Sequence, residues 1–436
     1  MPNLRRRLSL HTAVALVIAS MIGTGVFTTS GFALADLQSR RAVLLAWLVG
    51  GVLAMFGALS YGALARHIPE SGGEYTFLGR IVHPLAGFLA GWISLLVGFT
   101  VPIAAAALAL AAYLAAPLGG ALQPEWIGTI ALVAVGLLHG RKLLAGLILQ
   151  NIAVGLLLLV IGAFIIFGIV GVATPSATLT PLADVEVGAF AVTLIWVSFS
   201  YSGWNAAVYV AGEVREPKRN LHLSLWLATG LVTLIYLALN AIFLYGAPVA
   251  ELAGRAEVAA IAAEALGGPR LRLLVSIMIS LGLFTSISAM VMIGPRIYAR
   301  MADDGLFPKW FETRGEVPSA AVLFQVVFAI VVIWIADLRE LLSYIGFTLG
   351  LSAAATVASL IWLRWKKGPE QVPVPGFPWI QGIFVVFVLT ASTFMAVRQP
   401  VEAGLGLLTV LAGVPLYWIM RRHGRSAGRH PAQGRL

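Results

Sequence analysis

Long hydrophobic runs dominate the chain, and short polar or charged segments separate them. A helix needs about 20 apolar residues to cross the hydrocarbon core of a bilayer. Twelve runs reach or approach this length: about 10–34, 42–65, 84–115, 126–139, 143–173, 188–212, 222–246, 271–300, 319–336, 339–363, 377–397 and 401–420. The runs are continuous rather than alternating, which favours helices over the strands of a membrane β-barrel. The pattern predicts an all-α polytopic membrane protein with 12 transmembrane helices.

The composition narrows the class of protein further. Of the 436 residues, 59% are hydrophobic and 11% are charged, whereas soluble proteins carry about 25% charged residues. This excludes a soluble enzyme, a disordered regulator and a nucleic-acid-binding protein, and it makes membrane lipid the expected surroundings. The chain contains no cysteine, so thiolate catalysis, cysteine-ligated metals and a disulfide-linked accessory subunit are excluded as well.

The basic residues are distributed unevenly between the two ends of the predicted spans. The net charge is +10, with 29 Lys and Arg in total. If the N-terminus lies in the cytoplasm, 22 of these 29 fall in cytoplasmic segments and the other 7 on the opposite side. Cytoplasmic loops of membrane proteins are enriched in Lys and Arg. We therefore expect a multi-pass protein of the cytoplasmic (inner) membrane with both termini in the cytoplasm, and a basic, disordered tail over 421–436.

Ionisable residues are placed at the ends of the predicted spans. All 19 carboxylates and all 7 histidines fall in loops or near helix ends, and charged groups at mid-membrane usually mark ion or proton paths. No cluster of His and carboxylates suggests a metal ligand set. We expect no catalytic residues, metal or cofactor, and a binding site made of backbone groups, hydroxyls and aromatic rings.

The first span contains two glycines on either side of a threonine, at Gly23, Thr24 and Gly25. Glycine weakens a helix by about 1 kcal/mol relative to alanine, so the pair can let the backbone unwind. Unwound backbone survives in a bilayer only where it lines a cavity or is buried in protein. The N–H groups that begin the second half-helix would then suit a carboxylate. Alternatively, the glycines only allow close helix packing.

The sixth span contains a polar and aromatic cluster between Val197 and Asn205. Interruptions at corresponding positions of two halves are the sequence signal of an inverted-repeat transporter and its binding site. Four spans separate this cluster from the first span, which predicts two repeats of five helices. Tyr201 and Trp204 can also be explained as ordinary packing residues.

Four segments of the chain resemble motifs of the amino acid–polyamine–organocation (APC) superfamily, most closely the L-type amino acid transporters and their bacterial relatives. They read IGTGVF at 22–27, FSYSGWN at 199–205 with GEVREPKRNL at 212–221, IPESGGEY at 68–75, and PRIYAR at 295–300 with DGLFP at 304–308. The resemblance implies a LeuT-like fold in a single transporter domain over 1–420. Its parts would be inverted repeats at 8–173 and 188–363 and accessory helices at 377–420.

The resemblance also implies roles for individual residues. The substrate carboxylate would meet N–H groups of Gly23, Thr24 and Gly25, and the ammonium group would meet carbonyls of Met21, Phe199 and Ser202. Phe199 would be a gate over the substrate, and Trp204 and Asn205 would shape the far side of the pocket. The remaining expected positions are Ile22, Ser200 and Gly203 for binding, with Tyr201 and Glu213 for gating. Glu213 is explained either by a cytoplasmic gate with Arg215 or an N-terminal arginine, or by a solvated helix end.

The chain departs from many such relatives in the fifth span. A lysine is common there, but the alignment through Gln150 and Asn151 places Leu157 at that position. The nearby polar candidates for a cation site are Thr285, Ser286 and Ser288, without a carboxylate.

The expected function is therefore transport of neutral L-amino acids by alternating access, as sodium-independent exchange or facilitated transport. Proton- or sodium-coupled symport is the alternative. A major-facilitator transporter and a membrane-embedded enzyme are remote ones.

Overall fold

The computed structural model describes residues 8–115, 118–120, 122–139, 143–171, 185–312, 318–336 and 338–426. The first half contains α1 (Leu10–Met21), α2 (Thr24–Leu37), α3 (Arg40–His67), α4 (Glu74–Ile81), α5 (Pro84–Ile93), a π-helix (Ser94–Thr100), α6 (Val101–Ala115), α7 (Pro124–His139) and α8 (Leu143–Gly171). The second half contains α9 (Val187–Ser200), α10 (Ala206–Tyr209), α11 (Pro217–Gly246), α12 (Val249–Leu252), α13 (Val258–Ile293), α14 (Pro295–Asp303), α15 (Ser319–Ile333), α16 (Leu338–Lys367), α17 (Trp379–Arg398) and α18 (Pro400–Ser426). The described residues form no β-strand, only an isolated bridge between Leu8 and Val214.

The helices confirm a polytopic membrane protein. Within the described ranges, 9 helices or helix pairs are long and apolar enough to cross a bilayer. Three shorter apolar helices, α7, α9 and α15, coincide with the predicted spans 126–139, 188–212 and 319–336. The total of twelve spans and the grouping into two five-helix repeats stay predictions.

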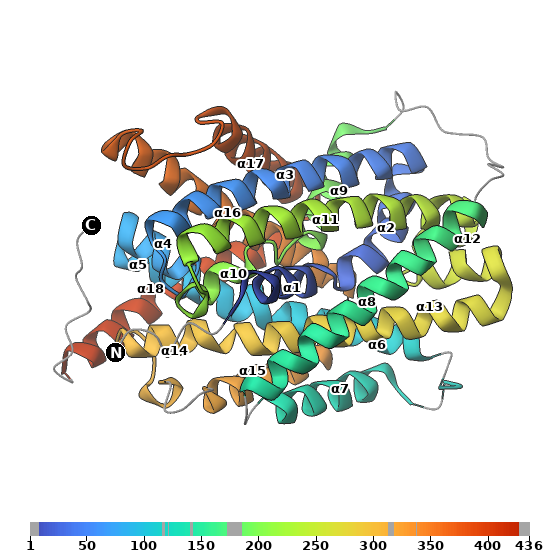
Figure 1. Cartoon of the computed structure of the whole chain (residues 1–436), viewed down its shortest axis with the longest axis horizontal. Helices are drawn as coiled ribbons and strands as arrows, with labels where there is room; N and C mark the ends of the chain where they lie inside the picture. The colour runs from blue at the N-terminus through green and yellow to red at the C-terminus, as the bar shows by residue number, and fades with distance from the viewer. Residues whose placement is uncertain are drawn as a thin grey trace.

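The outer helices carry the apolar surface. In α8, Leu159 is 69% exposed and Ile166 is 70% exposed, and Leu411 of α18 is 63% exposed. Large apolar side chains at such exposure are what a lipid-facing surface requires. Figure 1 shows α17 and α18 at the periphery and α1, α2 and α10 between the longer helices. Short, interrupted helices therefore occupy the protected interior.

The C-terminal end differs from the prediction of a tail that begins at residue 421. Helix α18 continues to Ser426, so the first basic residues after the last span belong to the helix. The remainder of that expected tail, 427–436, lies outside the described residues.

Candidate functional site

The first span is broken between α1 and α2. Helix α1 ends at Met21, and the backbone of Ile22 (φ −74°, ψ 86°) and Gly23 (φ −136°, ψ −154°) leaves the helical region. Helix α2 begins at Thr24, so Thr24 and Gly25 are already its first two residues. The N–H groups of a first helical turn have no acceptor inside their own helix and attract anions. The expected break in the first span is therefore present. It lies at Ile22 and Gly23, so it begins one residue before the glycine pair.

The glycines of this break face other helices at close range. A Cβ added to Gly23 would meet the Oγ atom of Ser286 in α13 at 2.8 Å. A Cβ added to Gly25 would meet the Cα atom of Ser200 in α9 at 2.4 Å. A side chain at Gly25 would have to displace backbone, whereas one at Gly23 would have to displace only a hydroxyl group. In this conformation, Gly25 therefore serves the close packing of α2 against α9.

Tyr236 of α11 joins the two broken spans. Its side chain is fully buried, and its hydroxyl group donates a hydrogen bond to the carbonyl of Met21. The same O–H group lies 3.1 Å from the carbonyl oxygen of Ser200, so its single proton is shared between the two carbonyls. The Met21 carbonyl, which was expected to meet a substrate ammonium group, already has a protein partner here.

The sixth span is interrupted by a turn over residues 201–205 between α9 and α10. Gly203 adopts φ +96°, a left-handed conformation that favours glycine. A Cβ at this position would also meet the carbonyl oxygen of Ser20 in α1 at 2.5 Å. The N–H of Ser202 donates to the carbonyl of Phe199 at 2.7 Å. The turn is therefore a compact structure whose backbone lies directly against α1.

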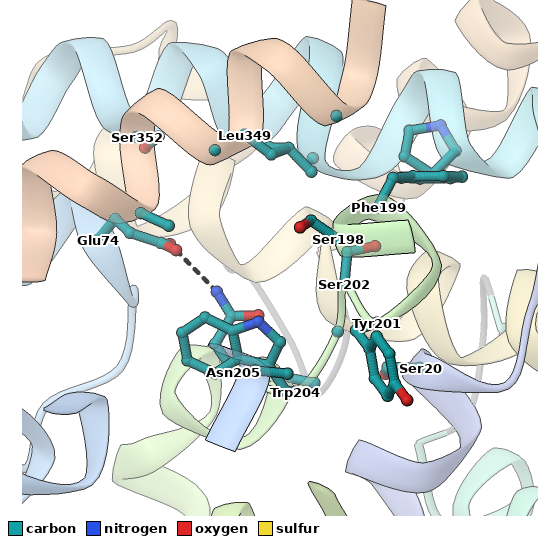
Figure 2. A pocket seen from close by; sticks show the side chains of 18 of the residues that line it. Ser20, Glu74, Ser198, Phe199, Tyr201, Ser202, Trp204, Asn205, Leu349 and Ser352 are labelled. Carbon is teal, nitrogen blue, oxygen red and sulfur yellow. Dashed lines mark hydrogen bonds between the residues drawn. The ribbon is translucent and has the colours of Figure 1, made fainter. Parts of the chain in front are cut away.

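A cavity of about 110 Å³ lies beside this turn (Figure 2). This is well above the roughly 10–15 Å³ that one water molecule needs. Its polar wall consists of Ser20, Glu74, Ser94, Ser198, Ser202, Asn205, Tyr209 and Ser352. Its apolar wall includes Phe99, Phe199, Trp204, Met290, Leu349, Phe384 and Val388. The cavity therefore offers hydroxyl and amide groups together with apolar surface.

The expected binding residues divide between the two breaks. Six positions of the sixth span line the cavity: Phe199, Tyr201, Ser202, Gly203, Trp204 and Asn205. The other six do not line it and are buried in the surrounding helices: Met21, Ile22, Gly23, Thr24, Gly25 and Ser200. From α1, only Ser20 reaches the cavity wall. Of the two broken spans, the sixth contributes more residues to the cavity wall than the first in this conformation.

The two aromatic gate candidates have different surroundings. Phe199 borders the cavity and is 6% exposed. The Tyr201 side chain is fully buried, its ring lies edge-on to Trp47 at 5.8 Å, and its hydroxyl donates to the Trp47 carbonyl at 3.0 Å. Both residues border the cavity, but the hydroxyl of Tyr201 is held by the Trp47 carbonyl. The gating roles of Phe199 and Tyr201 stay predictions.

Glu213 lies in an ion pair beyond the sixth span. Its carboxylate accepts a hydrogen bond from Nε of Arg296 in α14 at 2.6 Å, a partner that was not considered from the sequence. Next to it, the N–H of Leu8 donates to the Glu213 carbonyl and the N–H of Arg215 donates to the Leu8 carbonyl, both at 2.9 Å. The N-terminal arginines proposed as partners, residues 5–7, lie outside the described residues.

The three hydroxyls of the candidate cation site have different surroundings. Thr285 bonds to backbone carbonyls of its own helix, at 2.7 Å to Gly282. The Oγ atom of Ser288 lies 2.6 Å from Nε2 of His139. The buried Oγ atom of Ser286 has no hydrogen-bond partner among the described residues. Leu157 is buried and packs toward α13, so an apolar side chain occupies the neighbouring space.

Glu74 is the site residue that sequence reasoning missed. It was placed in a loop, but it is 5% exposed, begins α4 and lines the cavity. Its carboxylate accepts hydrogen bonds from Tyr61 at 2.9 Å, from Asn205 at 2.7 Å and from the hydroxyl of Tyr209. Glu74 lies at a helix end, as expected of the carboxylates, but the expected site of backbone groups, hydroxyls and aromatic rings did not include it. The IPESGGEY motif at 68–75 was the available signal, because it contains this glutamate. No group of three His, Asp or Glu capable of holding a metal occurs among the described residues.

Comparison with known proteins identifies relatives along nearly the whole chain. A family model described as "Amino acid permease" matches residues 8–418. The human large neutral amino acids transporter small subunit 2 is 29% identical over 95% of this chain and 80% of its own length. The mouse Asc-type amino acid transporter 1 is 25% identical over 95% and 81%, and the human cystine/glutamate transporter is 26% identical over 96% and 85%.

Proposed function

Because the chain belongs to the amino acid permease family, whose members named above are transporters and not enzymes, we propose that it transports neutral L-amino acids across the cytoplasmic membrane. The family match sets aside both a major-facilitator transporter and a membrane-embedded enzyme. The absence of cysteine means that no accessory subunit is attached by a disulfide. We place the N- and C-termini in the cytoplasm on the basis of the distribution of Lys and Arg.

The observation that carries this proposal is that the two broken spans pack against each other beside the cavity. The Gly203 turn lies against the Ser20 carbonyl of α1, and Tyr236 contacts carbonyls of both breaks. Two paired, interrupted helices are the arrangement in which transporters of the inverted-repeat type bind substrate. We propose the LeuT-like arrangement of two five-helix repeats on this basis.

The lining of the cavity supports a neutral substrate. The carboxylate of Glu74 is the one charged group in the described cavity wall, and it already accepts three hydrogen bonds. A cationic side chain would have to displace neutral donors to pair with it. An anionic side chain would have no basic partner in this wall.

We further propose that the amino acid carboxylate binds the N–H groups at the start of α2. In the conformation described, these groups lie behind the cavity wall. Binding would therefore require α1 and α2 to move relative to α9, as alternating access demands. Sodium-independent exchange is the proposed mode, because the candidate hydroxyls do not converge on one point. Proton- or sodium-coupled symport is the competing mode.

Uptake into proteoliposomes tests the proposal directly. Labelled leucine should accumulate faster in vesicles preloaded with unlabelled leucine than in empty ones, and a sodium or pH gradient should add little. Neutral amino acids should compete, whereas Lys, Arg and Glu should compete weakly. Strong competition by charged amino acids would contradict the substrate class. Uptake that needs an ion gradient, rather than internal substrate, would replace exchange with symport.

A further inference from the structure

Asn205 lies beside Glu74 in the cavity wall, and both hydrogens of its side-chain amide already donate hydrogen bonds. Its Nδ2 atom lies 2.7 Å from Oε1 of Glu74 and 3.2 Å from the hydroxyl oxygen of Tyr209. Figure 2 shows the amide nitrogen of Asn205 turned toward Glu74. An asparagine amide has two N–H donors and one carbonyl acceptor. Only the Oδ1 acceptor is left for a ligand.

The orientation of this amide is fixed by its neighbours. Both side-chain oxygens of Glu74 accept hydrogen bonds from neighbouring residues. A flipped amide would therefore place Oδ1 of Asn205 against an oxygen that acts as an acceptor. Tyr209 imposes the same orientation, because its hydroxyl proton is donated to the other oxygen of Glu74. That hydroxyl can therefore only accept from Asn205. Glu74 therefore excludes the flipped amide directly, and it also does so through Tyr209, whose hydroxyl it holds in the accepting orientation.

Glu74 is itself held in place by its surroundings. Its side chain is buried, and Tyr61 of α3 donates to the oxygen that also accepts from Asn205. The ring of Tyr61 packs edge-on against Trp204 at 4.6 Å, which adds to the rigidity of this corner. A buried polar network whose members all have partners defines a single geometry.

We infer that Glu74 is a positioning residue which makes Asn205 a hydrogen-bond acceptor toward the substrate side chain, so that the transporter favours neutral amino acids with a side-chain O–H or N–H donor. The inference rests on the proposed function, because it concerns selectivity among transported amino acids. Threonine and valine test it well, since they have nearly the same shape and differ in one hydroxyl group. A single hydrogen bond corresponds to about a threefold to tenfold preference.

The experiment compares threonine with valine as competitors of labelled-substrate uptake in proteoliposomes. Wild-type protein should bind threonine about threefold to tenfold more tightly than valine. In Glu74→Gln, the amide at residue 74 can donate as well as accept, so Asn205 is free to flip and the threonine/valine ratio should approach one. In Glu74→Asp, an acceptor-only group remains and the preference should persist even if the uptake rate falls. A ratio in Glu74→Gln equal to that of wild type would overturn the inference.

Two further variants separate orientation of the amide from general damage to the site. Glu70→Gln changes a carboxylate of the preceding loop that pairs with Arg80 at 3.1 Å, outside the cavity, and should leave the ratio unchanged. Tyr209→Phe removes one acceptor of the Asn205 amide but leaves Glu74 in place, so the preference for threonine should persist. If Glu74→Gln does not fold, loss of this preference in Tyr209→Phe counts against the inference by itself. If wild-type protein takes up no amino acid at all, the proposed function fails, whereas equal competition by threonine and valine rejects only the inference.

Discussion

The glycines of the break between α1 and α2 face protein, whereas the turn after α9 faces the cavity. Gly25 lies against Ser200 and Gly23 against Ser286, so the first break is filled on the side where a ligand was expected. The turn at 201–205 instead exposes Ser202, Trp204 and Asn205 to the cavity. Similar glycine-containing interruptions thus have different surroundings. In this conformation, the first break is packed against neighbouring helices, whereas the turn after α9 lines the cavity.

The largest effect expected from this difference is at Gly25. In Gly25→Ala, the added Cβ would lie 2.4 Å from backbone of Ser200, and we expect the folded protein to lose about 3 kcal/mol or more. The measurement is the apparent melting temperature in detergent, with fluorescence-detected gel filtration. Gly98→Ala is the matched control, since its Cβ enters the cavity wall with no atom closer than 3.6 Å and should not lower the melting temperature. A Gly25→Ala protein as stable as wild type would show that the first break is not closely packed.

A smaller loss is expected when the connection between the two breaks is removed. Tyr236→Phe leaves the buried carbonyls of Met21 and Ser200 without their donor, which costs about 1–3 kcal/mol. The melting temperature should fall, and it should fall less in Tyr344→Phe. That control removes a hydroxyl bonded to Thr409 at 2.8 Å near the periphery. Equal effects in the two variants would mean that Tyr236 does not join the breaks more strongly than an ordinary contact.

Gly23 provides the sharper test, because its close neighbour is only a hydroxyl group. Gly23→Ala should cost about 1 kcal/mol, and the double variant with Ser286→Ala should regain most of that loss, since the Ser286 Oγ atom is what the new Cβ meets. Stability and amino acid uptake are both measured. Recovery of stability without recovery of uptake would indicate that the Cβ blocks a ligand, and the first break would then share the binding role.

The smallest effect should come from sodium. Thr285 and Ser288 are bonded to other protein groups, so we expect uptake in sodium to equal uptake in choline within error. Ser286→Ala should leave this comparison unchanged. Steep stimulation by external sodium that disappears in Ser286→Ala or Ser288→Ala would assign a cation site beside the first break and contradict sodium-independent exchange.

Much of the helical architecture follows from hydrophobicity alone. Each of the 9 sufficiently long helices coincides with a predicted span, because a run of apolar residues long enough to cross a bilayer has few alternatives to a helix. The breaks in the first and sixth spans were also predictable, because paired glycines and clustered polar residues weaken a helix inside an apolar run.

The site was less predictable because its walls come from distant parts of the chain. Glu74 and Asn205 are 131 residues apart, and no local pattern brings α4 beside α10. The burial of His139 against Ser288 across 149 residues was missed for the same reason. The orientation of a glycine relative to its neighbours likewise depends on tertiary packing. The sequence therefore identified the two broken spans, but not Glu74 or which atoms of the broken spans face the cavity.

The β-bridge between Leu8 and Val214 has a mechanical consequence. Two backbone hydrogen bonds of 2.9 Å attach the segment before α1 to the chain that follows α10. These bonds couple the start of the first span to the segment that follows the sixth span. We therefore expect the two segments to move together during transport. Distance probes at residues 8 and 214 should keep a constant separation through a turnover, while both move relative to a probe on α13.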